Sequence, residues 1–158
     1  MQKLGLTGNI CAGKSEAEEI FKNKGFMVID LDKTAHRFLE NSEEIKNHFK
    51  TLDRKKIAEI VFSDPDEKKY LESILHPMLF DYVQNELKKD YDKILVSGAL
   101  LYEAGFDKLF DKMIFIDAPY DIRLQRLMKR NNLDEAAAKK RMDCQNDRNK
   151  SLADFISF

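Results

Sequence analysis

The chain of 158 residues has no tryptophan, three prolines, six glycines and two cysteines. Cys11 and Cys144 lie too far apart in sequence to form the spacing of a zinc site, and sparse cysteine is typical of a reducing compartment. Because proline and glycine are so scarce, no stretch has the composition of a linker, and the chain is long enough for a single domain with its own core. We therefore expect one domain that works in the cytoplasm.

An excess of charge of one sign and long apolar runs are also missing. The formal net charge is −1 although 35% of the residues are charged, so no overall attraction to nucleic acid or to an anionic membrane is expected. No apolar run approaches the roughly 18 residues of a membrane-spanning helix, and the first residues already have the pattern of a strand rather than of a leader peptide. The expected partners are small molecules, and the protein is expected to be a monomer.

The most informative stretch is Gly8-Asn9-Ile10-Cys11-Ala12-Gly13-Lys14-Ser15, which fits the phosphate-loop pattern G-x-x-x-x-G-K-[ST]. The apolar residues before it predict a buried strand, and residues 16–24 predict a helix. Such a strand–loop–helix turns backbone N–H groups towards a phosphate chain, and its glycines let the backbone come close to the phosphates. The loop and Glu16 are therefore predicted to bind ATP, with Lys14 on the β- and γ-phosphates and the Ser15 hydroxyl on Mg²⁺.

Strands and helices alternate along the rest of the chain. Apolar runs predict further strands at 26–30, 93–96, 113–117 and 154–158. Helical patterns are predicted at 31–39, from residue 42, at 54–62, from residue 65, at 119–130 and at 133–145. This alternation predicts an α/β fold with a parallel sheet and helices on both of its faces.

The helical block of residues 31–90 is too long for a plain crossover between two strands. We expect it to be an insertion beside the phosphate site. The core would then consist of residues 1–30, 91–129 and 146–158.

The longest helix of this block has a clear start. Asp64 fits the N-cap, Pro65 the first helical position and Glu67 the third position of a capping box. Apolar pairs then recur every four residues and predict a broad buried face. Pro77 is expected to interrupt the helix with a kink near His76.

Two acids, Asp30 and Asp32, follow the second predicted strand. Ligands of open α/β sheets bind beyond the carboxyl ends of the strands. A carboxylate at that edge can orient an acceptor hydroxyl and take its proton during phosphoryl transfer. One of the acids can equally cap the helix that starts near Lys33. Two acids spaced by two residues allow both roles, and we predict Asp32 to be the catalytic base.

His76 is a second candidate, because the proline that follows it frees backbone groups that favour contact with a ligand. A histidine without function on a helix face fits the same pattern.

A basic cluster consists of Arg123, Arg126 and Arg130 on one predicted helix, with Arg141 on the next. In phosphoryl transfer, mobile arginines neutralise transition-state charge while a lid closes and excludes water. A solvated helix face gives the same pattern. The Asn131-Asn132 break suits a hinge, so residues 130–145 are the predicted lid, with Arg130 and Arg141 as catalytic candidates.

Residues 2–156 resemble the dephospho-coenzyme A (dephospho-CoA) kinase family. The phosphate loop is common to many kinases and GTPases, but the other matching segments are much more specific. These segments are Asp30-Leu31-Asp32, Asp53-Arg54, Leu75-His76-Pro77, Leu100-Leu101-Tyr102-Glu103, 126–130, 141–145 and 153–156.

The resemblance implies a phosphotransferase that uses ATP and Mg²⁺ to phosphorylate the ribose 3′-hydroxyl of dephospho-CoA, giving CoA and ADP. It implies a P-loop kinase core, a helical acceptor-binding insertion at 31–90 and a helical lid. Asp32 takes the place of the family's proposed base, His76 and Glu103 would contact the acceptor with it, and Lys14, Arg130 and Arg141 would act on the transferring phosphoryl group.

The chain departs from the family pattern after the third predicted strand. An acid and a proline commonly stand there in the family, whereas this chain has Ser97, Gly98 and Ala99. The change removes the acid expected to contact Mg²⁺ through water. Two alternatives remain open: a similar kinase acting on another small acceptor, such as a nucleoside monophosphate, and a nucleotide-binding module that does not catalyse.

Overall fold

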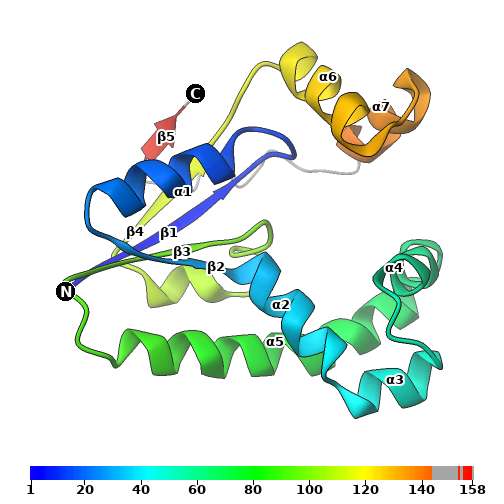
Figure 1. The fold of residues 1–158 in the computed structure, drawn as a ribbon, viewed down its shortest axis with the longest axis horizontal. Coiled ribbons are helices and arrows are strands. Elements are labelled where there is room, and N and C mark those ends of the chain that lie inside the picture. The colour runs from blue at the N-terminus through cyan, green and yellow to red at the C-terminus, as the bar shows by residue number, and fades with distance from the viewer. Residues whose placement is uncertain (144–152, 154, 158) are drawn as a thin grey trace. The chain divides into compact units, whose positions relative to one another are not determined.

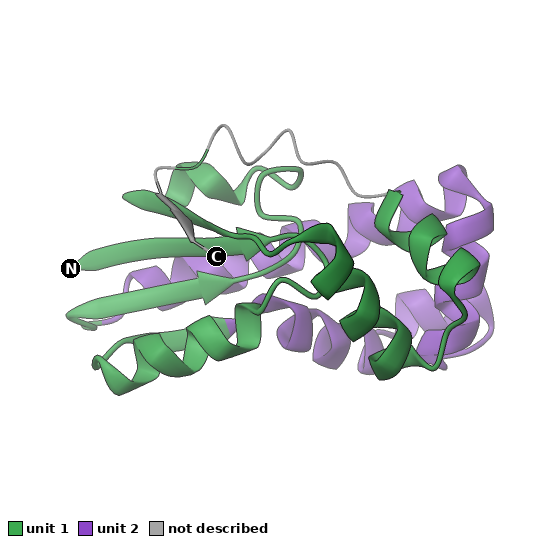
Figure 2. Cartoon of the chain, turned by 90° about the horizontal axis from the view of Figure 1, so that it is seen from above, with its two compact units in different colours: residues 1–29, 90–158 green, residues 30–89 purple. Residues whose placement is uncertain are grey.

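The computed structural model describes residues 1–143, 153 and 155–157 (Figure 1). The chain forms two compact units (Figure 2). Unit 1 contains residues 1–29 and 90–158, and unit 2 contains residues 30–89. The two stretches of chain that flank unit 2 therefore fold together.

Unit 1 is built on a five-stranded sheet with the order β2-β3-β1-β4-β5. Its strands are β1 (Gln2–Gly8), β2 (Met27–Asp30), β3 (Lys93–Ser97), β4 (Lys112–Ile116) and β5 (Phe155–Ser157). The pairs β1–β3, β1–β4 and β4–β5 are parallel. The predicted α/β fold with a parallel sheet is confirmed, and the strand that leads into the phosphate loop is the central one.

Strand β1 is central because both of its faces are apolar. Leu4 and Leu6 are buried in one cluster with Leu95 and Ile116, and Phe21 of α1 (Lys14–Asn23) packs against them. On the other face a side chain at Gly5 would collide with the Sδ atom of Met113. Burying a leucine side chain contributes roughly 1.5–3 kcal/mol, so this packing holds β1 and α1 firmly on either side of the loop.

The other elements of unit 1 among the described residues are η1 (Phe106–Leu109), α6 (Tyr120–Asn131) and α7 (Glu135–Asp143). The short 3₁₀ helix η1 was not predicted, and it buries Phe106. The α6 helix ends at Asn132, whose φ of 51° is left-handed, so the predicted break at Asn131-Asn132 is confirmed. The predicted continuation to residues 144–145, the strand ends at 154 and 158, and Cys144 lie outside the described residues.

Unit 2 contains α2 (Leu31–Glu40), α3 (Glu43–Phe49), α4 (Arg54–Ser63) and α5 (Pro65–Leu87). A side chain caps the start of each helix by accepting a backbone N–H bond. The caps are Asp30 on Lys33, Ser42 on Ile45, Asp53 on Lys55 and Asp64 on Asp66 and Glu67. Such a cap contributes typically about 1 kcal/mol, which explains why four helices start within so short a stretch.

Two expectations for α5 are wrong. Glu67 does not complete a capping box, because the Asp64 N–H group bonds to the Ile60 carbonyl (3.0 Å) and Glu67 Oε2 pairs with His48 Nε2 at 2.6 Å. Pro77 does not interrupt the helix, which is continuous through it, whereas the kink expected near His76 stays a prediction. The predicted apolar face is confirmed by buried Leu75, Leu79, Val83 and Leu87, and this burial outweighs the backbone bond that Pro77 cannot make. Among the described residues, no helix is both long and apolar enough to span a bilayer.

Candidate nucleotide-binding site

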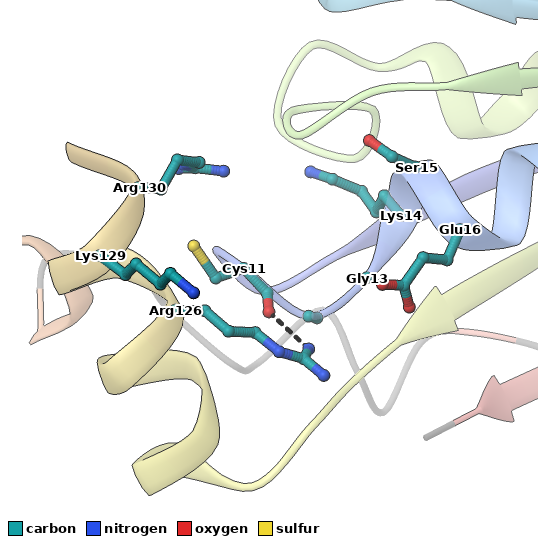
Figure 3. Close-up of a pocket in the computed structure, with 9 residues that line it drawn as sticks. Cys11, Gly13, Lys14, Ser15, Glu16, Arg126, Lys129 and Arg130 are labelled. Atoms are coloured by element: carbon teal, nitrogen blue, oxygen red, sulfur yellow. Dashed lines mark hydrogen bonds between the residues drawn. The ribbon is translucent and has the colours of Figure 1, made fainter.

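A cavity of about 560 Å³ lies beside the phosphate loop (Figure 3). Its walls come from the loop and the start of α1 on one side and from α6 on the other. The lining residues are Cys11, Ala12, Gly13, Lys14, Ser15, Glu16, Arg126, Lys129 and Arg130. The cavity therefore lies entirely within unit 1.

The backbone of the loop explains its glycines. A side chain at Gly8 would collide with the carbonyl oxygen of Ile116, so β4 leaves room for no other residue there. Gly13 has a φ of 109° and caps the start of α1, where the free N–H groups of the first helical turn attract anions. Cys11 has a left-handed φ of 58°, and the Ala12 N–H group bonds back to the Asn9 carbonyl at 3.1 Å. The result is a tight turn that ends at a helix N-terminus.

The cavity carries four cationic side chains and one carboxylate. Lys14 and Arg130 extend towards one another from α1 and α6 (Figure 3). Arg126 NH1 donates to the Cys11 carbonyl at 3.0 Å, which ties α6 to the loop. Leu124 and Leu127 of α6 form a buried cluster with Ala138 and Met142 of α7, and Ile10 and Cys11 of the loop pack against this cluster. An excess of fixed positive charge beside a helix N-terminus suits a polyphosphate.

The structure brings together many of the predicted site residues. Residues 11–16 and Arg130 line the cavity, whereas Gly8, Asn9 and Ile10 form the start of the loop and are not among the lining residues. Arg141 is exposed on α7 and does not line the cavity either.

Also on α7, a hydrogen bond to Glu135 raises the pKa of Lys139 above its usual 10.5.

In unit 2 the two candidate acids have different positions. Asp30 Oδ1 accepts the Lys33 N–H at 3.1 Å and is therefore the N-cap of α2. Asp32 lies exposed in the first turn of the same helix. His76 is partly buried on α5, and in unit 1 Glu103 is exposed in the turns after β3. The capping role that the sequence allowed for either acid thus belongs to Asp30.

Sequence reasoning missed several residues around the loop. It did not consider Asp117, whose buried carboxylate Oδ1 accepts a hydrogen bond from Asn9 Nδ2 at 3.1 Å. It grouped Arg123 with the exposed arginines, but Arg123 is 7% exposed and its Nε atom donates to the Ala118 carbonyl at 2.9 Å. It also passed over Lys129. Asp117 ends an apolar strand just as Asp30 does, so the same signal was present.

No group of three or more histidine, cysteine, aspartate or glutamate side chains gathers to hold a metal ion in the part of the chain that the structure describes. Ser15 is exposed at the start of α1, and a hydroxyl is an oxygen donor of the kind that Mg²⁺ accepts. Ser97 is buried at the end of β3, opposite Leu6 of β1.

A phosphate loop at the end of the central strand of a parallel sheet, facing the cations of the later helix α6, is typical of a P-loop kinase. The model of the dephospho-CoA kinase family matches residues 2–156. The chain belongs to this family, and the resemblance described above is confirmed. Membership of a kinase family implies ATP as the co-substrate.

Individual relatives are similar to this protein over nearly its full chain. A dephospho-CoA kinase from Lactobacillus acidophilus is 34% identical over a match that covers 97% of this chain and 86% of that protein. The solved structure of TT1252 from Thermus thermophilus is similar with a TM-score of 0.86 at 31% identity. The structure of a dephospho-CoA kinase from Campylobacter jejuni has a TM-score of 0.69 at 34% identity. Each structural match covers 97% of this chain and 85% of the other.

Proposed function

We propose that the protein transfers the γ-phosphoryl group of ATP to the ribose 3′-hydroxyl of dephospho-CoA and releases CoA and ADP. The observation that carries this proposal is the family match over residues 2–156, on a fold whose phosphate loop faces a cationic helix. Family membership supports the reaction, and the residues that line the cavity support the assignment of its phosphate side to the loop and α6.

The phosphate side of the reaction belongs to unit 1. The loop from Gly8 to Glu16 binds the phosphate chain, and Lys14 and Arg130 neutralise the charge that develops on the transferring group. Ser15 would hold Mg²⁺ through its hydroxyl oxygen, and the ion would supply positive charge against the charge of the phosphates. Ser97 is neutral, so at the end of β3 it would not offer the ion the negative charge of a carboxylate.

The acceptor side is assigned to unit 2 and to Glu103 of unit 1. Asp32 accepts the proton of the 3′-hydroxyl while the oxygen of that hydroxyl forms a bond to the γ-phosphorus. At the same time the bond between the γ-phosphorus and the bridging oxygen breaks, and that oxygen leaves with ADP. His76 and Glu103 contact the acceptor, and unit 2 is the acceptor-binding part. Residues 130–145 form a lid that closes over the substrates and brings Arg141 to the transferring phosphoryl group. The capping role of Asp30 supports the assignment of the chemistry to Asp32, since Asp30 already accepts the Lys33 N–H group at the start of α2. We further propose that the protein works as a monomer in the cytoplasm.

The test is a coupled assay of ADP release with ATP and Mg²⁺, run without acceptor, with dephospho-CoA and with AMP, together with chromatographic detection of CoA. We expect release only with dephospho-CoA and one CoA for each ADP. Release with AMP alone would identify a nucleoside monophosphate kinase. Tight ATP binding without turnover on either acceptor would identify a non-catalytic module.

A further inference from the structure

Two aspartates lie at opposite ends of one pair of strands. Strands β1 and β4 pair in parallel from Leu4↔Lys112 to Gly8↔Ile116. The same register continues one residue beyond each end. At the start, Asp111 Oδ2 accepts a hydrogen bond from the Lys3 backbone N–H at 3.0 Å. At the end, Asp117 Oδ1 accepts one from the Asn9 side chain at 3.1 Å.

The surroundings of the two aspartates differ. Asp111 is exposed, and so its hydrogen bond is made in contact with solvent. Asp117 is 7% exposed, its partner Asn9 is 2% exposed, and the charged Arg123 beside them is 7% exposed. Burying such ionised groups is costly, and apolar residues of similar size would hold two strands at least as well. Strand pairing alone therefore does not account for the polar group at the loop end.

The buried group meets the phosphate loop at its second residue. The Asn9 backbone N–H bonds to the Ile116 carbonyl at 3.3 Å, and its carbonyl accepts the Ala12 N–H at 3.1 Å. With the side-chain bond to Asp117, Asn9 is therefore held from three directions. Because the loop binds phosphate largely through backbone groups, the position of this residue sets the path of the following N–H groups.

The Asp117 carboxylate is itself held in place. Its Oδ1 atom accepts the Ala118 N–H at 2.8 Å and lies 4.0 Å from Arg123 Nε. Arg123 stands one turn before Arg126 on α6, and Arg126 binds the Cys11 carbonyl in the middle of the loop. A single carboxylate thus lies between the start of the loop and the helix that carries Arg126, Lys129 and Arg130.

We propose that Asp117 is a positioning residue for nucleotide binding. It acts through the Asn9 side chain, and Arg123 keeps the carboxylate in its place. Asp117 does not itself line the cavity, so it affects the nucleotide through the geometry of the loop. This inference rests on the proposed kinase function, but it concerns the nucleotide half-reaction and can be tested without an acceptor.

The test compares variants by the dissociation constant of a fluorescent ATP analogue and, separately, by thermal unfolding. Asp117→Ala is expected to weaken analogue binding about tenfold or more, as loss of a buried hydrogen bond to a charged group implies. Asp111→Ala removes a bond of the same kind from the same strand pair and is the matched control. It is expected to change binding by less than about twofold. In turnover, Asp117→Ala is expected to raise the KM for ATP and leave the KM for dephospho-CoA within about twofold.

Asp117→Ala leaves the buried Arg123 guanidinium without its counter-charge and can prevent folding. The pair Asp117→Ala/Arg123→Met and Asp117→Asn/Arg123→Met avoids this, since both variants lack the buried cation and differ only in whether residue 117 offers an oxygen to Asn9. We expect the alanine form to bind the analogue about tenfold more weakly and the asparagine form to stay within about threefold of the unaltered protein.

Equal affinity in these two double variants would overturn the proposal, as would equal effects of Asp111→Ala and Asp117→Ala. If the unaltered protein binds the analogue but does not phosphorylate dephospho-CoA, the proposed function fails, while the binding comparison still decides the role of Asp117.

Discussion

The two compact units are built in different ways. In unit 1 the phosphate site is one contiguous loop whose shape is set by two glycines and by the adjacent strand β4. In unit 2 no such loop was found, and each of its helices is instead started by its own side-chain cap. A site formed by the backbone depends on a few positions that accept only glycine. A unit whose helices are capped by side chains distributes its stability over many residues that other residues can replace.

Aromatic and polar pairs then join the helices of unit 2. The His48 ring stacks on Tyr70 with 3.7 Å between ring centroids, and its Nε2 atom pairs with Glu67. Arg54 NH1 lies 2.7 Å from His36 Nδ1 and so joins α4 to α2. Pairs that are partly exposed contribute roughly 0–1 kcal/mol each, so no single one of them holds the unit together. Loss of one loop residue in unit 1 is therefore expected to affect phosphate chemistry strongly, whereas loss of one cap or one pair in unit 2 is expected to affect stability weakly.

The largest expected effect is that of Lys14→Ala. Removing a charge aimed at the transferring phosphoryl group costs about 3 kcal/mol or more of transition-state stabilisation, so turnover is expected to fall at least about a hundredfold, measured as kcat in the coupled assay. Lys22→Ala, near the other end of α1 and paired with Glu19 at the surface, is the control and is expected to leave kcat unchanged. Retention of more than about a tenth of the turnover in Lys14→Ala would exclude this role.

Asp32→Asn is expected to lower turnover by roughly two orders of magnitude while leaving ATP affinity little changed, because the amide keeps the size of the side chain but cannot take the proton. Asp30→Asn is the matched control, since asparagine is as good an N-cap as aspartate. If Asp30→Asn is the more damaging change and Asp32→Asn the milder one, the two assignments are reversed.

Ligands should act differently on the two units in hydrogen exchange. Dephospho-CoA alone is expected to slow exchange around His76, and adding a non-hydrolysable ATP analogue is expected to slow it across residues 31–90 and 130–145. Residues 3–7 and 93–96 should change far less, because the buried strands of the sheet already exchange slowly. If saturating dephospho-CoA protects nothing between 31 and 90, unit 2 is not the acceptor-binding part.

The smallest expected effects concern the caps of unit 2. Asp64→Ala is expected to lower the free energy of unfolding by about 1 kcal/mol, because it removes the bonds to the Asp66 and Glu67 N–H groups. Glu67→Gln should lower the free energy of unfolding by less than Asp64→Ala does, since the pair of Glu67 with His48 is partly exposed. Urea unfolding measures both changes, and analogue binding should remain that of the unaltered protein. A loss of analogue affinity in either variant would contradict the separation of roles between the units.

Much of this protein could be predicted from local sequence. The phosphate loop, the parallel sheet, the breaks between helices and the caps at Ser42 and Asp64 depend on residues near one another in the chain, where steric and hydrogen-bonding preferences act directly. The resemblance to the kinase family depended on the same short segments. Where local signals misled, as at Glu67 and Pro77, a partner from another helix or the burial of a whole face outweighed the local preference.

Only the tertiary structure decided which charged residues act together. Asp117 and Asn9 lie 108 positions apart, and the register of β1 against β4 brings them into contact. Arg123 and Arg126 look alike in sequence, yet the packing of α6 buries the first and leaves the second beside the loop. Local preferences select helices, strands and turns, but the partner of a buried charge depends on how those elements pack, because only packing excludes the water that would otherwise solvate it.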